Sequence, residues 1–188
     1  MKKIIENYNI DNVRYFKLSY LEKEINNFKK VYSRLLKYAE PKALWKKYKI
    51  DYIKRPEIHF DNKVINSSYI SKKLENSKYI YFFVVTLGKK WEKMESSLKD
   101  DIELYNTHKF GAELVEYFVD LTEERIKLSE KRNHMRFTIR LSPGYGDFSL
   151  EYQKMFKEEL KFEEIEVKLM DNLLLIPRKT VTAVMGGY

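Results

Sequence analysis

The most informative absence in this 188-residue chain is cysteine. Without a thiol, the protein cannot form disulfides, ligate an iron–sulfur cluster or a thiolate zinc site, or use a cysteine nucleophile or redox pair. The three histidines, His59, His108 and His134, stand apart, and none belongs to a spacing typical of metal ligands. Any electron that this protein helps to transfer would therefore have to come from another molecule.

Long apolar runs are also missing. The first twelve residues, MKKIIENYNIDN, contain only two isoleucines before a glutamate, so they do not resemble an export signal. The longest uncharged apolar stretch, residues 79–88, is about half of the ~20 residues that a membrane-spanning helix requires. The sequence thus predicts a cytoplasmic protein that does not cross a membrane.

Positive charge and aromatic side chains are abundant. Lys plus Arg total 36 against 28 Asp plus Glu, a formal net charge of +8, and 15% of the residues are aromatic. This much buriable surface excludes a globally disordered chain, while the charge favours anionic partners. The lysines nevertheless alternate with acids, as in LEKEINNFKK and TEERIKLSEK, which is typical of solvated helix faces. Because no recognisable nucleic-acid-binding module is present either, the sequence argues against a nucleic-acid partner.

Apolar spacing and capping residues predict the order of helices and strands. The expected helices cover residues 18–38, 69–75 after a cap at 66–68, Asp100 or Asp101 to about 127, and 147–149 to about 160. The expected strands cover residues 43–53, 79–87, 135–142, about 165–169 and about 179–185.

The mixed order of these elements predicts the fold class. There is no βαβ repeat and no linker, so we expect a single α+β domain over residues 1–188, with an N-terminal helical segment at 1–40 and a core at 41–188. The core should contain a mixed or antiparallel sheet, packed with one long central helix and several shorter helices.

One segment, RLSPGYGDFS, combines unusual chemistry. The alternation of MRFTIRLS predicts a strand that places Arg140 and Ser142 on the same face, and Pro-Gly-Tyr-Gly must then form a turn. A guanidinium, exposed backbone groups and an aromatic ring within six residues suit a small zwitterion that carries a carboxylate. The alternative interpretation is an edge strand before a tight turn, with Arg140 merely solvated.

The same segment resembles the S-adenosylmethionine-binding activation (reactivation) domain of cobalamin-dependent methionine synthase, in its short stand-alone form. The resemblance rests on RLSPGYGD and the later LLLIPRKTVTAVMG, with looser support from TLG at 86–88 and from AELVEYFVDLTEER. It implies that the methyl donor is held by Arg140, Ser142, Pro143, Gly144, Tyr145 and Glu116. In this family pattern, Arg140 supplies the carboxylate fork, Gly144 a close backbone approach, and Tyr145 an aromatic wall, while Glu116 lies over the site.

The resemblance also implies a function with no catalytic residue and no metal of the chain's own. The protein would bind S-adenosylmethionine and present it for reductive methylation of the cobalamin of a separate methionine synthase or related corrinoid protein. A flavodoxin-like reductant would supply the electron, so the chain would be an accessory subunit of a cobalamin-dependent methyltransferase system. The alternative is a non-catalytic module that docks on a corrinoid protein or on RNA through its basic surface.

Overall fold

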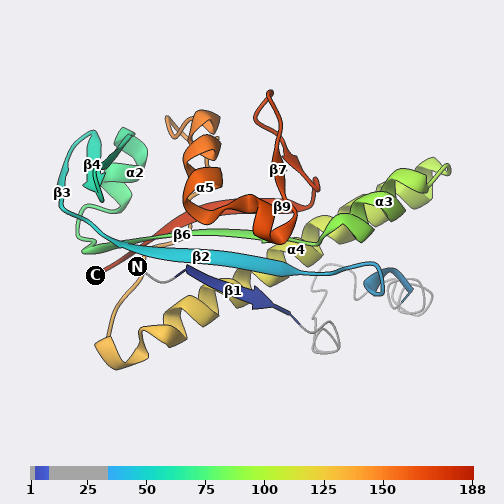
Figure 1. Cartoon of the computed structure of the whole chain (residues 1–188), viewed down its shortest axis with the longest axis horizontal. Coiled ribbons are helices and arrows are strands. Elements are labelled where there is room, and N and C mark those ends of the chain that lie inside the picture. Colours follow the sequence, from blue (N-terminus) through green and yellow to red (C-terminus); the bar gives the residue numbers. More distant parts are fainter. Residues whose placement is uncertain (1–2, 9–33) are drawn as a thin grey trace.

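Among the residues that the structure describes, the main sheet has four antiparallel strands in the order β1-β2-β6-β9 (Figure 1). The computed structural model describes residues 3–8 and 34–188. The strands are β1 (Lys3–Asn7), β2 (Lys42–Lys49), β6 (Tyr79–Thr86) and β9 (Thr180–Gly187). Most of the helix expected at residues 18–38 lies outside the described residues, although residues 34–36 are helical.

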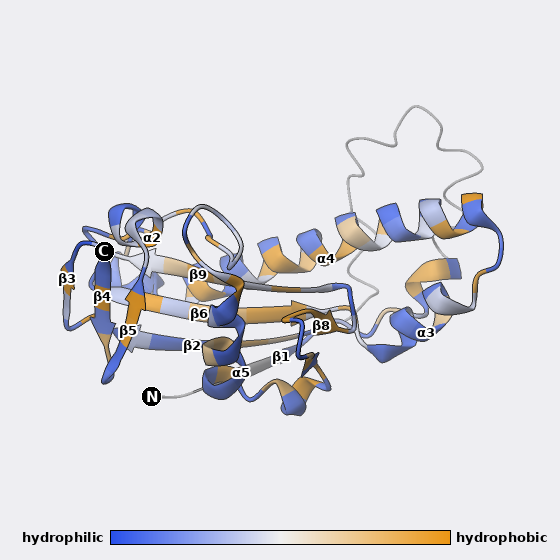
Figure 2. Ribbon diagram, turned by 90° about the horizontal axis from the view of Figure 1, so that it is seen from above, coloured by the Kyte–Doolittle hydropathy of each residue, from blue (hydrophilic) through white to orange (hydrophobic). Residues whose placement is uncertain are grey.

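Strand β6 lies between two hydrophobic cores. The long helix α4 (Asp101–Ser129) covers one face of the sheet, while α5 (Gln153–Leu160) and a smaller sheet cover the other (Figure 1). Tyr81 and Phe83 therefore pack in the core between the sheet and α4, and Phe82 packs in the core between the sheet and α5. Hydrophobic and hydrophilic residues alternate along α4, as its amphipathic spacing predicts (Figure 2). The α+β class, the antiparallel sheet and the long helix are all confirmed.

Side-chain caps fix the starts of the helices where the sequence predicts them. Asp100 accepts a hydrogen bond from the backbone N–H of Glu103 at 2.7 Å and begins α4. Ser67 accepts from the N–H of Ile70 at 3.1 Å and begins α2 (Ser68–Lys73). Such caps satisfy backbone donors that the first helical turn leaves unpaired. The chain therefore encodes these boundaries locally.

The strand expected at residues 43–53 is instead two strands in different sheets. The smaller sheet contains β3 (Tyr52–Lys54), β4 (Glu57–Phe60) and β5 (Lys63–Asn66). Ile50 donates its backbone N–H to Lys78 at the start of the main sheet, whereas the next residue, Asp51, donates to His59 in β4. The backbone therefore changes sheets between two consecutive residues, which alternation of side chains cannot reveal.

The remaining elements of the described ranges are short. They are α3 (Lys89–Ser97), the 3-10 turns η2 (Lys131–Asn133), η3 (Leu150–Tyr152) and η4 (Phe162–Ile165), and the strands β7 (Lys168–Leu169) and β8 (Leu175–Ile176). The strand expected at about 165–169 is thus reduced to two residues, because η4 occupies its beginning. Helix α3 was not expected from the sequence.

Candidate functional site

Residues 135–142 follow the outer edge of β9, but the regular strand expected there is wrong. Phe137 pairs with Gly187. Four residues later, Leu141 pairs with Val184, which is only three residues from Gly187 along β9. The extra residue is a β-bulge, and it reverses the face that each following side chain takes. Phe137 accordingly packs against the core between the sheet and α4, whereas Leu141 is buried in the core between the sheet and α5.

The bulge directs Arg140 towards α4. Its Nη1 donates to Asp120 at 2.6 Å and to Glu123 at 2.7 Å. Its Nη2 donates to Glu116 at 2.8 Å. The three acids are spaced by four and three residues, so they share one face of the helix. In an unbroken strand continuing from Phe137, Arg140 would face the opposite side of the sheet, away from these carboxylates.

The three carboxylates around Arg140 differ in exposure. The side chains of Glu116 and Asp120 are 51% and 68% exposed, whereas that of Glu123 is 12% exposed. Partial burial lowers the pKa of Arg140, but the hydrogen bonds to Glu123 and Asp120 outweigh this effect and the pKa is raised overall. The guanidinium therefore stays charged, and two of its three partners remain accessible to solvent.

The expected turn at residues 143–146 is present beside this cluster. The N–H of Tyr145 donates to the carbonyl of Ser142 at 3.4 Å, and the N–H of Gly144 donates to the carbonyl of Phe148 at 2.6 Å. Gly144 has φ of +100°, which L side chains rarely adopt. Pro143 is buried, while Tyr145 exposes its ring. The turn therefore presents a glycine backbone and an aromatic side chain to solvent.

Asp147 fastens this turn to the start of α2. Its carboxylate accepts the hydroxyl of Ser67 and the backbone N–H groups of Ser68 at 2.8 Å and Tyr69 at 3.0 Å. The hydrogen bond from Ser67, followed by that from Tyr69, lowers the pKa of Asp147. Of the residues expected to cap the next helix, Ser149 caps the 3-10 turn η3 by accepting from the N–H of Glu151, while α5 itself has no side-chain cap among the described residues. Asp147 instead caps a helix far earlier in the chain.

The structure brings the predicted residues Arg140 and Glu116 into direct contact. The adjoining turn is formed by Ser142, Pro143, Gly144 and Tyr145. Among the described residues, no hydrogen bond or ion pair joins their side chains to Glu116. Asp120 and Glu123 were missed. Their spacing from Glu116 is visible in the sequence, but it is also the spacing of an ordinary solvated helix face.

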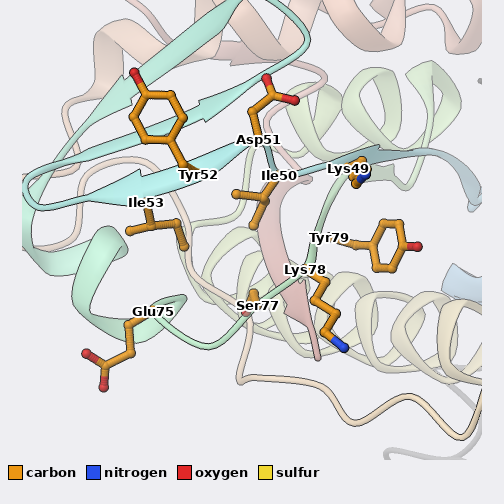
Figure 3. A pocket seen from close by; sticks show the side chains of 9 residues that line it. All are labelled: Lys49, Ile50, Asp51, Tyr52, Ile53, Glu75, Ser77, Lys78 and Tyr79. Carbon is orange, nitrogen blue, oxygen red and sulfur yellow. The ribbon is translucent and has the colours of Figure 1, made fainter.

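A separate hollow of about 330 Å³ lies at the start of β6, away from these residues (Figure 3). Ile50 and Ser77 lie between the other lining residues, while the carboxylate of Glu75 points away from them (Figure 3). It contains none of the residues predicted to hold a ligand. Within residues 3–8 and 34–188, no group of histidine and acidic side chains is arranged to hold a metal ion. No helix in the same ranges has the length and apolar character needed to cross a bilayer.

Comparison with known proteins supplies one decisive observation. The sequence matches no protein-family model and no curated protein. Among solved structures, the chain is similar to a crystal structure of the MetH reactivation domain bound to AdoHcy, with a TM-score of 0.71. The chain has the fold of the MetH reactivation domain.

The similarity covers 99% of this chain and 78% of the MetH reactivation domain. Sequence identity is 15%, so the match establishes a shared fold rather than shared residues. This fold is the one implied by the RLSPGYGD and LLLIPRKTVTAVMG segments. The role of the Arg140 cluster towards a ligand therefore has to be argued from its own geometry.

Proposed function

We propose that this chain binds S-adenosylmethionine beside α4 and the 143–146 turn, and presents it for reductive methylation of the cobalamin of a separate methionine synthase or related corrinoid protein. The observation that carries the proposal is the contact between Arg140 and Glu116 next to the Gly144 turn. The fold supports it, because a domain with the same fold has been solved with AdoHcy bound.

The charges of the cluster suit the amino-acid end of this ligand. A ligand carboxylate can replace Glu116 on the guanidinium, and the carboxylate of Glu116 is then free to accept the ligand ammonium group. One ion pair becomes two, so no charge is left without a partner. Because Glu116 is half exposed, breaking its pair with Arg140 costs little. Tyr145 offers its ring to the cationic sulfonium.

The chain's own contribution to the reaction is to bind and orient the methyl donor. The sulfonium carries its own leaving group, so the protein needs no general acid or base, and correct alignment can itself lower the barrier by several kcal/mol. The corrinoid protein supplies the methyl acceptor, and a flavodoxin-like reductant supplies the electron. We place this system in the cytoplasm.

Calorimetry with S-adenosylmethionine tests the proposal directly. At ~100 times its dissociation constant, the ligand should stabilise the protein by about 2.7 kcal/mol and raise the melting temperature. The absence of heat and of a thermal shift at millimolar ligand would overturn the proposal. Without a corrinoid protein, the purified chain should not transfer radiolabelled methyl groups to thiols or amines.

The net charge of +8 favours a second candidate, a non-catalytic module that docks on a corrinoid protein or on RNA. The two functions differ in their ligand. Tight binding to random RNA with a steep salt dependence, without binding of S-adenosylmethionine, would establish the second candidate in place of the first.

A further inference from the structure

Glu123 differs from the other two carboxylates that contact Arg140. Its side chain is largely buried, and besides Arg140 it accepts a hydrogen bond from Lys127 at 3.1 Å. Glu116 and Asp120 are mostly exposed, and among the described residues each pairs only with Arg140. Glu123 is therefore held in one place by two cations, while its neighbours on the same helix face can exchange with solvent or with another partner.

The guanidinium of Arg140 has one occupied edge and one edge that is nearly open. Nη1 donates to both Glu123 and Asp120, whereas within residues 3–8 and 34–188 the only acceptor of Nη2 is Glu116. The Nε of Arg140 donates to no other described residue. A carboxylate that displaces Glu116 can thus take Nε and Nη2 together, in the bidentate geometry that arginine favours.

From this division we propose that Glu123 is a positioning residue, which anchors Arg140 through Nη1 while the Nε and Nη2 edge receives the carboxylate of the ligand. The inference rests on the proposed function and adds two roles to it. Glu123 keeps the guanidinium in place during the exchange, and Asp120 acts as an exposed competitor for the same cation.

The irregular backbone around Arg140 explains why an anchor is needed. Thr138 and Leu141 make backbone hydrogen bonds to β9, but the bulge interrupts the ladder between them. Arg140 is therefore carried by a segment without a continuous strand ladder to hold it. Glu123 is carried by a 29-residue helix packed on the sheet. A binding group on an irregular segment gains precision when a rigid element holds its side chain.

The test compares two ligands, S-adenosylmethionine and its decarboxylated analogue, by calorimetry. Glu123→Ala should weaken binding of S-adenosylmethionine by about tenfold or more, because the carboxylate meets a poorly placed guanidinium. Binding of the decarboxylated analogue should change by less than about twofold. Glu123→Gln, which keeps an acceptor for Nη1, should recover part of the lost affinity. Glu124→Ala is the matched control, since Glu124 is an exposed acid on α4 without a contact to Arg140.

Each outcome has a distinct meaning. An equal loss for both ligands would show that Glu123 acts through the fold, and unchanged affinity for both would show that it holds nothing; either result overturns the inference. If Glu123→Ala does not fold, Glu123→Gln carries the comparison, with an expected selective loss of about threefold. Failure of the wild-type chain to bind either ligand would instead overturn the proposed function.

Asp120→Asn tests the competitor separately. Removing an exposed competing charge should leave the affinity for S-adenosylmethionine unchanged or raise it up to about fivefold. A loss as large as that of Glu123→Ala would show that the two acids share one role, and would contradict the distinction between anchor and competitor.

Discussion

Two clusters of cations and carboxylates join α4 to the region of β9, and they differ in their access to water. In one, Arg140 contacts three acids of α4, two of which are largely exposed. In the other, Lys179, the residue before β9, donates to the carbonyl of His108 on α4 at 2.8 Å and lies 3.9 Å from Glu95 on α3. The side chains of Lys179 and Glu95 are only 5% and 0% exposed.

The difference shows how similar charges can serve opposite purposes. A buried ion pair cannot exchange partners cheaply, because each charge would be left without water or a counter-charge. Burial also lowers the pKa of Lys179, even though the nearby Glu95 opposes this effect. The Lys179 cluster is therefore suited to hold α3 and α4 against β9. The Arg140 cluster is suited to exchange one of its carboxylates for that of a ligand.

The largest effect is expected at the Lys179 cluster, which is sealed from water by burial. Lys179→Met should lower the free energy of unfolding by about 3–5 kcal/mol, because the carbonyl of His108 loses its hydrogen-bond donor and the buried Glu95 loses a polar neighbour. Urea denaturation measures the change. The double variant Lys179→Met/Glu95→Gln should recover part of the loss. A single variant as stable as wild type would show that the cluster is not sealed.

A smaller effect, confined to ligand binding, is expected at the Arg140 cluster, which is open to water. Arg140→Met should reduce affinity for S-adenosylmethionine by about 10- to 150-fold, the equivalent of ~1.5–3 kcal/mol for a charge-assisted hydrogen bond. Its free energy of unfolding should change by less than about 1 kcal/mol, because Glu116 and Asp120 are largely exposed and Glu123 keeps its hydrogen bond from Lys127. Arg136→Met, an exposed position on the same segment, is the control for charge. A large loss of stability with unchanged affinity would make Arg140 structural.

Stability against pH sharpens the contrast further. Because the pKa of Lys179 in the folded protein is below its ordinary value of 10.5, the folded chain releases this proton first as the pH rises. In that window the unfolded chain binds more protons, so the free energy of unfolding gains a contribution that increases with pH. The difference in stability between wild type and Lys179→Met should therefore widen as the pH rises towards 10.5. A difference in stability that narrows as the pH rises would contradict the lowered pKa of Lys179.

Salt should produce the smallest effect. Raising the ionic strength from about 0.1 M to about 1 M shortens the screening length from ~10 Å to ~3 Å and weakens exposed pairs. The small stability difference caused by Arg140→Met should move towards zero, while that caused by Lys179→Met should hardly change. Denaturation of both variants across a salt series checks this, and equal sensitivity would remove the distinction between open and sealed clusters.

The parts of the fold that the sequence predicts are those encoded over short distances. Asp100 and Ser67 begin their helices through residues three positions away, and the apolar run of β6 marks a strand buried on both faces. By contrast, Asp147 caps a helix almost eighty residues earlier, a contact that no local pattern contains. Such a long-range contact depends on how helices, strands and turns pack together in the folded chain.

The candidate site shows the same limit. The alternation in MRFTIRLS is unbroken, and nothing in it indicates that this segment will have one residue more than the part of β9 with which it pairs. Glu123 looks like one acid among many on an exposed helix until Arg140 is placed against it. The resemblance to a family led to Arg140 and Glu116, which the structure joins, but their role towards a ligand stays a proposal.

The extra residue of the bulge beside β9 affects the edge segment in two ways. It sets the face of the sheet that each side chain takes, and it sets the length of the segment. Deleting Ile139 would leave a regular strand in which Arg140 still faces α4 and Leu141 still faces the other core. The deletion would, however, draw Arg140 by about 3.3 Å along the edge relative to one of its flanks, which is enough to break a hydrogen bond. Chains that share this fold can therefore differ by one residue here and keep every side chain on its face, so an alignment gap at this point carries geometric meaning.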